Sequence, residues 1–129
     1  MLWYIVVGSA LGGVSRYLLG GVVQRLWDTT FPTGTLLINV AGSFLLGAFL
    51  RYGVDTPALS PEMRGLLTIG FCGGFTTFST FGYETVTMLE DGEWGRAGLY
   101  VGLSLALSLL AVILGFAAAR EAVAWRERL

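Results

Sequence analysis

The stretch GFCGGFTTFSTF, residues 70–81, lies near the middle of an apolar segment that is long enough to cross a membrane. Its adjacent glycines weaken a helix, and hydrocarbon cannot satisfy the hydroxyl groups that follow them. Four of these fall within five positions, at Thr76, Thr77, Ser79 and Thr80. The stretch therefore predicts a helix break that faces protein, water or an ion rather than lipid.

The composition indicates a polytopic membrane protein. Hydrophobic residues make up 54% of the chain and the mean hydropathy is +0.70, with the charges clustered between apolar runs. The net charge of −1 comes without a basic block, so nucleic acid is not an expected partner. With no histidine and the single cysteine Cys72, the sequence offers no disulfide and no credible catalytic pair. We expect no enzyme, and expect Cys72 to be a small inward-facing residue.

Four apolar runs are predicted to cross the membrane, at about residues 2–23, 33–50, 65–87 and 96–119. Residues 1–129 are thus expected to form one all-α, four-helix transmembrane domain, whose third helix is broken near the bilayer midplane. Breaks at that depth line a cavity or mark ion and substrate sites. Residues 51–64 are predicted as exposed turn structure and residues 120–129 as a charged tail. No basic leader precedes the first run, so we expect that run to be retained.

Polar or small residues recur every four positions on two predicted helices, which places them on one face of each helix. They are Thr35, Asn39, Ser43 and Gly47 on the second helix, and Tyr100, Ser104 and Ser108 on the fourth. Either stripe alone also fits a helix-packing seam, and Tyr100 also fits an interfacial aromatic belt. Together with the hydroxyl cluster, the stripes favour a polar path. Asn39 needs several hydrogen-bond partners in mid-membrane, so we expect it to line the path or to hold a network.

Phe75, Phe78 and Phe81 recur every three residues and alternate with hydroxyls. The edge of an aromatic ring carries positive potential, so these rings can contact an anion without trapping it. Arg16 lies about 12 Å inside its span at the helical rise, which favours a position on a water-filled vestibule. Glu84 is either its counter-charge or a second vestibule residue, and the sequence does not choose between them.

The arginines predict topology, and the size of the chain predicts assembly. The side holding both termini carries five arginines (Arg51, Arg64, Arg120, Arg126 and Arg128) and the other side carries two (Arg25 and Arg96), so the positive-inside rule favours cytoplasmic termini. Four short helices can hardly enclose a polar path. We therefore expect a homodimer or larger assembly with glycine-rich faces at the contact. The small-xxx-small pair Gly8 and Gly12 predicts that another helix comes close to the first span.

Three motifs in order over nearly the whole chain resemble the small bacterial fluoride channels known as Fluc or CrcB. They are GGVSRY at residues 12–17, PTGTLLINVAGSFLLG at residues 32–47 and GFCGGFTTFSTF at residues 70–81. The resemblance implies an antiparallel, dual-topology homodimer in the bacterial inner membrane, with one fluoride pore on each side of a two-fold axis. The five-to-two arginine count departs from the near balance that dual topology favours.

The resemblance also implies residue roles. The backbone carbonyls of Gly73 and Thr76 would hold a structural sodium ion (Na+) between the subunits, and the ring edges of Phe78 and Phe81 would contact fluoride. Asn39 would donate to the ion, Thr80 would contribute a hydroxyl near the rings, and Arg16 would sit at the vestibule. The polar track on the fourth helix would consist of Tyr100, Ser104 and Ser108.

The implied function is passive, fluoride-selective export that relieves fluoride toxicity. Many modest donors can replace the water of this strongly hydrated ion without binding it too tightly. One alternative is a four-helix drug/proton antiporter, which needs a membrane carboxylate that only Glu84 supplies. Another is a non-transporting membrane assembly subunit, which leaves the hydroxyl-aromatic stretch without a use.

Overall fold

The computed structural model describes residues 1–27 and 29–129, and these residues contain helices and no strands. This confirms the expected all-helical fold. The elements along the chain are α1 (Leu2–Leu26), α2 (Thr33–Asp55), α3 (Pro61–Gly65), the π-helix η1 (Leu66–Cys72), α4 (Gly73–Phe75), α5 (Phe78–Glu90) and α6 (Trp94–Glu127).

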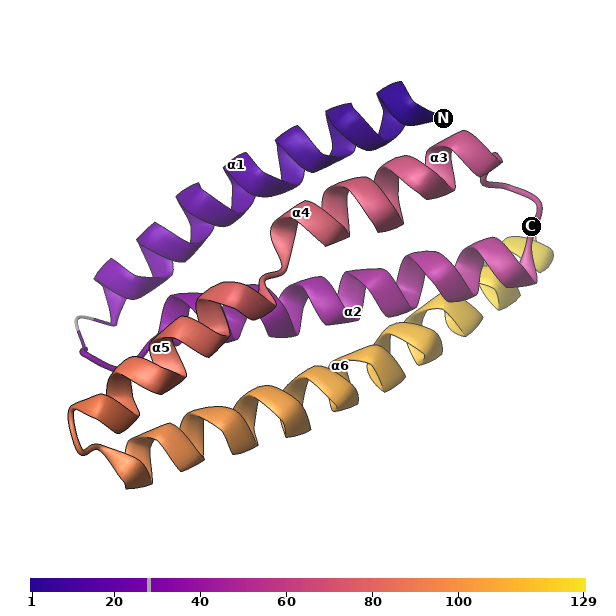
Figure 1. The fold of residues 1–129 in the computed structure, drawn as a ribbon. Coiled ribbons are helices and arrows are strands. Elements are labelled where there is room, and N and C mark those ends of the chain that lie inside the picture. Colours follow the sequence, from indigo (N-terminus) through magenta and orange to yellow (C-terminus); the bar gives the residue numbers. More distant parts are fainter. Residues whose placement is uncertain (28) are drawn as a thin grey trace.

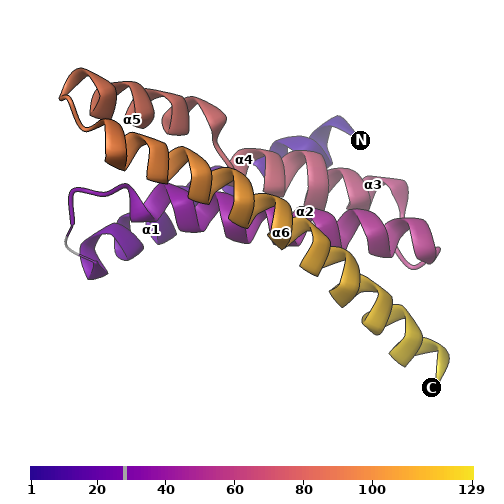
Figure 2. The ribbon, with the colours of Figure 1, turned by 90° about the horizontal axis from the view of Figure 1, so that it is seen from below.

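The helices form rods that run along the bundle in alternating directions (Figure 1). One rod is composite, because α3, η1, α4 and α5 follow one another along the bundle. Both termini lie at the same end of the molecule. α6 packs along α2, and its last turns diverge from the other helices (Figure 2).

Three of the described helices, α1, α2 and α6, are long and apolar enough to cross a membrane. This identifies an integral membrane protein, as expected. The composite rod contains no single helix of that length, because the chain between Pro61 and Glu90 is divided into four helical elements. The predicted membrane limits of all four runs stay a prediction.

Helix is more extensive than the sequence predicted at two places. α2 continues to Asp55, and α3 begins at Pro61, where the Ser60 side chain accepts a hydrogen bond of 3.1 Å from the Met63 amide. The predicted turn therefore shrinks to residues 56–60. α6 continues to Glu127 through the predicted tail, because its alanines, glutamates and arginines are strong helix formers. At 34 residues, α6 is about 50 Å long and exceeds the hydrocarbon thickness of about 30 Å.

Between α4 and α5 the backbone leaves the helical conformation. Thr76 has φ −86° and ψ 158°, and Thr77 has φ −150° and ψ 116°, so both residues are extended. The Thr77 side chain then caps α5 by accepting a hydrogen bond of 3.2 Å from the Thr80 amide. The seven-residue π-helix η1 leads into this segment, although π-helical structure commonly occupies a single turn. No residue pattern predicted this π-helix.

The glycines of α1 allow η1 and α4 to pack directly against this helix. A Cβ atom on Gly8 would overlap the Leu66 carbonyl oxygen, and one on Gly12 would overlap that of Phe71. From the other side, a Cβ atom on Gly74 would lie 2.7 Å from the Ser9 carbonyl oxygen. The predicted close helix approach is therefore present at Gly8 and Gly12. The segment that comes close is η1 with α4 of the same chain.

This packing predicts that neighbouring glycines respond differently to alanine. Gly12→Ala places a methyl group against backbone and should lower the free energy of unfolding by about 1–3 kcal/mol. Gly13 has no atom within 4 Å of an added Cβ, so Gly13→Ala should be neutral or stabilise by about 0.5–1 kcal/mol. Unfolding of the two purified variants in the same detergent measures the difference, and equal losses would contradict the packing.

Candidate functional site

A cavity of about 250 Å³, here called the inner cavity, lies where α2, the Thr76–Thr77 break and α6 meet. Five of the predicted path residues line it: Asn39, Phe78, Phe81, Ser104 and Ser108. Thr76, Thr77, Leu105 and Leu109 complete its wall. Its lining therefore combines a carboxamide, hydroxyls, two aromatic rings and leucines, which suits a small ion that needs several weak contacts.

The two rings of the inner cavity differ in their surroundings. The centroids of Phe78 and Phe81 are 5.7 Å apart with an interplanar angle of 45°. The Phe81 ring packs on the buried ring of Tyr100, with the two ring centroids 5.1 Å apart. Phe78 is 82% exposed, so within this chain one ring is fixed by packing and the other is left uncovered.

Ser104 contributes a hydroxyl without a bonded partner. Its side chain is 8% exposed, and its Oγ atom makes no hydrogen bond within the described residues. A buried hydroxyl in that condition costs free energy unless a ligand or water meets it. Because Ser104 lines the inner cavity, an occupant of that cavity can meet its hydroxyl.

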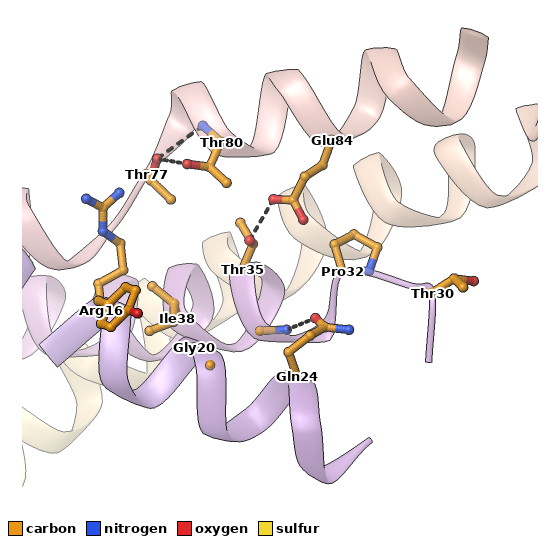
Figure 3. A pocket seen from close by; sticks show the side chains of 13 residues that line it. Arg16, Gly20, Gln24, Thr30, Pro32, Thr35, Ile38, Thr77, Thr80 and Glu84 are labelled. Atoms are coloured by element: carbon orange, nitrogen blue, oxygen red, sulfur yellow. Dashed lines mark hydrogen bonds between the residues drawn. The ribbon is translucent and has the colours of Figure 1, made fainter. Parts of the chain in front are cut away.

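A second cavity of about 540 Å³, here called the outer cavity, is lined mainly by α1, α2 and α5 (Figure 3). It holds the predicted vestibule residue Arg16 and the predicted donor Thr80. The Arg16 side chain points across the space toward the side where Thr77 lies. Thr77 is also the one residue that lines both cavities, so it separates them.

Glu84 lines the outer cavity and is held by hydroxyl groups. Its Oε1 atom accepts a hydrogen bond of 2.6 Å from Thr35 Oγ1 and a longer contact of 3.5 Å from the Tyr100 hydroxyl. No ion pair within the described part of the chain joins it to Arg16. Of the two roles that the sequence left open, this geometry favours a vestibule residue over a counter-charge.

Tyr100 is completely buried, at 0% exposure. It lies beside both cavities without lining either of them. Its ring packs between Phe31 and Phe81, and its hydroxyl points to Glu84. An interfacial belt position is therefore excluded for Tyr100, and the structure does not bring it together with Ser104 and Ser108 on the cavity wall.

Asn39 bonds the break through both ends of its carboxamide. Its Nδ2 donates to the Thr77 carbonyl oxygen at 3.0 Å, and its Oδ1 accepts from the Thr77 amide at 2.8 Å. The expected network role of Asn39 thus has a specific partner. Sequence reasoning did not select Thr77 as a site residue, although its place among the hydroxyls at the predicted break was the available signal.

The predicted sodium ligands Gly73 and Thr76 flank the end of α4. Gly73 is exposed and Thr76 is half-buried. In a continuous α-helix their carbonyls would accept from the amides of Thr77 and Thr80. These amides donate instead to Asn39 Oδ1 and to Thr77 Oγ1. Both carbonyls have therefore lost their helical donors. Cys72, just before them, is 1% exposed, which confirms its inward position.

Gln24 is a further residue of the outer cavity that the sequence did not reveal. Its Nε2 donates to the carbonyls of Thr29 and Phe31, at 2.8 and 3.0 Å, and its Oε1 accepts from the Gly34 amide at 3.1 Å. It thereby ties the end of α1 to the start of α2. A glutamine at a predicted helix end is common, so its pattern gave no signal.

Comparison with known proteins identifies relatives over most of the chain. The family model described as "CrcB-like protein, Camphor Resistance (CrcB)" matches residues 3–116. The fluoride-specific ion channel FluC of Geobacter sulfurreducens is 51% identical over 117 residues, which cover 91% of this chain and 94% of that protein. FluC of Syntrophotalea carbinolica is 45% identical over 120 residues, with 93% and 98% covered. FluC of Opitutus terrae is 47% identical over 118 residues, with 90% and 89% covered.

The Glu84 contacts predict unequal coupling energies. The short bond from Thr35 should give about 1–2 kcal/mol in a double-mutant cycle of Thr35→Val with Glu84→Gln. The 3.5 Å contact from Tyr100 is at the limit of a hydrogen bond, so the cycle of Tyr100→Phe with Glu84→Gln should give less than about 0.5 kcal/mol. Unfolding free energies of the variants measure both couplings, and the reverse order would contradict the geometry.

Proposed function

The chain belongs to the CrcB-like family, and from this membership we propose that it is a passive, fluoride-selective ion channel rather than an enzyme. It lies in the bacterial inner membrane as a multi-pass protein and exports fluoride, which relieves fluoride toxicity. An inside-negative potential favours anion exit by about 2.3 kcal/mol per charge per 100 mV. No energy-coupled step is therefore needed.

The inner cavity is the observation that carries the proposed path. It gathers Asn39, Phe78, Phe81, Ser104 and Ser108 around one space. Ring edges, hydroxyls and a carboxamide can each replace part of the water around fluoride, and none of them carries a full charge that would hold the ion. The unpaired Ser104 hydroxyl supports its role as a donor. Leu105 and Leu109 exclude water from the remaining wall.

The outer cavity serves as the vestibule from which fluoride enters. Arg16 attracts the anion, and Thr80 offers a hydroxyl beside Thr77, where the two cavities meet. Glu84 carries the opposite charge, and its hydroxyl partners keep it at one side of the space. Tyr100 lies outside both cavities and fixes the Phe81 ring and the Glu84 carboxylate, which line them.

The working unit is an antiparallel, dual-topology homodimer with two pores. Phe78, Ser79 and Thr80 are all exposed on the single chain. Hydroxyl groups and open backbone at this depth are not stable against lipid, so a second copy supplies the missing cover. Two-fold symmetry then repeats each path once. In this dimer the third membrane crossing runs from α3 to α5 and is broken near the midplane.

The break fits a structural sodium ion held by the carbonyls of Gly73 and Thr76 from both subunits. Carbonyl oxygens suit a hard cation, and both carbonyls have lost their helical donors. The exposure of Gly73 supports access from a partner subunit. Bound there, the ion supplies a fixed positive charge that joins the two broken helices.

The relatives also separate this proposal from its alternatives. They are named as fluoride-specific ion channels. An antiporter would need Glu84 to exchange protons with a substrate, yet Thr35 and Tyr100 already engage that carboxylate. A non-transporting assembly subunit would leave the polar cavities at the break without a function. Of these three functions, a channel is the one that uses both cavities.

Flux from liposomes tests the function directly. Reconstituted protein should release loaded fluoride much faster than chloride, as read with ion-selective electrodes. Phe81→Ile removes a ring edge from the path and should lower fluoride flux by about tenfold or more, equivalent to about 1.4 kcal/mol in the barrier. Phe44→Ile is the matched control, because Phe44 lines neither cavity. Fluoride release no faster than from protein-free liposomes would refute the proposal.

The sodium site predicts a specific ion effect on stability. A cation that binds only the folded dimer raises its stability by about 1.4 kcal/mol for each tenfold increase above its dissociation constant. Thermal unfolding should therefore shift upward with sodium chloride, compared with N-methylglucamine chloride at equal ionic strength. Identical unfolding curves in the two salts would count against the site.

A further inference from the structure

The break interrupts the four helical hydrogen bonds that would join the amides of residues 77–80 to the carbonyls of residues 73–76, and side chains take over two of these amides. In a continuous helix the amide of Thr77 would bond the Gly73 carbonyl, and that of Thr80 would bond the Thr76 carbonyl. Asn39 Oδ1 receives the first amide at 2.8 Å, and Thr77 Oγ1 receives the second at 3.2 Å. These two amides stay bonded, while the carbonyls of Gly73 and Thr76 lose their helical donors.

Asn39 and the backbone of Thr77 form two hydrogen bonds, one in each direction. The carboxamide accepts from the Thr77 amide and donates to the Thr77 carbonyl at 3.0 Å, as a neighbouring peptide group would. Thr77 is only 9% exposed, so water is a poor substitute for either bond. An unmet amide at such a position is costly. The pair therefore joins the middle of α2 to the break.

From this geometry we infer that Asn39 is a positioning residue. By bonding both backbone groups of Thr77, it holds the break open, leaves the Gly73 carbonyl available to a cation and fixes Thr77 between the inner and outer cavities. The inference rests on the proposed function and deepens it. It assigns Asn39 a role that acts through the backbone as well as through any contact with the anion.

The hydrogen count of the carboxamide limits its other role. Nδ2 carries two hydrogens, and the bond to the Thr77 carbonyl uses one of them. One hydrogen remains for the inner cavity, which Asn39 lines. Its direction is set by the two bonds to Thr77, so the same side chain that opens the cation site also aims a donor at the anion path. A change at Asn39 should therefore alter both sites.

Two shape-matched substitutions separate the two backbone bonds. Asn39→Leu removes both of them. Asn39→Asp keeps an acceptor for the Thr77 amide but sets a carboxylate against the Thr77 carbonyl. Ser108→Ala is the control, because Ser108 lines the same cavity from α6 and makes no hydrogen bond to the break within the described residues.

The test is amide hydrogen exchange of the reconstituted dimer, read on peptides that cover residues 73–81, together with the sodium concentration needed for half-maximal thermal stabilisation. Exchange at Thr77 reports local opening. Asn39→Leu should raise it by about tenfold or more and Asn39→Asp by a smaller factor, because one acceptor remains. Both should raise the half-maximal sodium concentration by about fivefold or more. Ser108→Ala should leave both readouts within about twofold of the unsubstituted protein.

If Asn39→Leu loses fluoride flux while exchange at Thr77 stays within twofold of the unsubstituted protein, the inference is overturned. Asn39 is then an ion donor alone. If Asn39→Leu does not yield a folded dimer, Asn39→Gln replaces it. The added methylene misaligns the carboxamide, so the same two changes are expected, and their absence overturns the inference. Exchange is measured without fluoride, so absent flux in the unsubstituted protein would refute the channel while leaving this result interpretable.

Discussion

The structure depends on the need to satisfy backbone hydrogen bonds where water is scarce. Each unpaired amide or carbonyl in hydrocarbon costs several kcal/mol, so a helix can open inside a membrane only if other groups take its donors. Here the carboxamide of Asn39 and the hydroxyl of Thr77 do so. The amides of Thr77 and Thr80 stay bonded, and the carbonyl oxygens of Gly73 and Thr76 lose their helical donors.

A second constraint keeps that opening in place. The backbone of η1 and α4 lies directly against α1, where a Cβ atom on Gly8 or Gly12 would overlap a carbonyl oxygen. The contact leaves little freedom for the chain that leads into the break. On the opposite side, the missing side chain of Gly42 lets Phe75 and Thr76 pack against α2. The glycines thus position the break, and Asn39 sets its hydrogen bonding.

The sequence predicted the elements of this site better than their connections. Adjacent glycines before clustered hydroxyls located the break within residues 70–81, and four-residue spacing identified the faces that carry Asn39, Ser104 and Ser108. Spacing along one helix does not say which backbone group lies opposite, so the bonds between Asn39 and Thr77 could not be derived. The π-helix and the identity of the segment that packs against Gly8 and Gly12 could not be predicted for the same reason, since both depend on how separate segments pack.

In the proposed channel, the location of Thr77 allows a cation site and an anion path to share one short segment. A bound cation needs free carbonyl oxygens, whereas a fluoride ion needs donors, so the two sites would compete for the same peptide groups in a regular helix. The extended conformation at Thr76 and Thr77 separates them. Carbonyls of the preceding turn are released, and the Thr77 hydroxyl and the α5 rings begin the donor-lined side. In the proposed channel, one local change of backbone conformation therefore supplies both kinds of ligand.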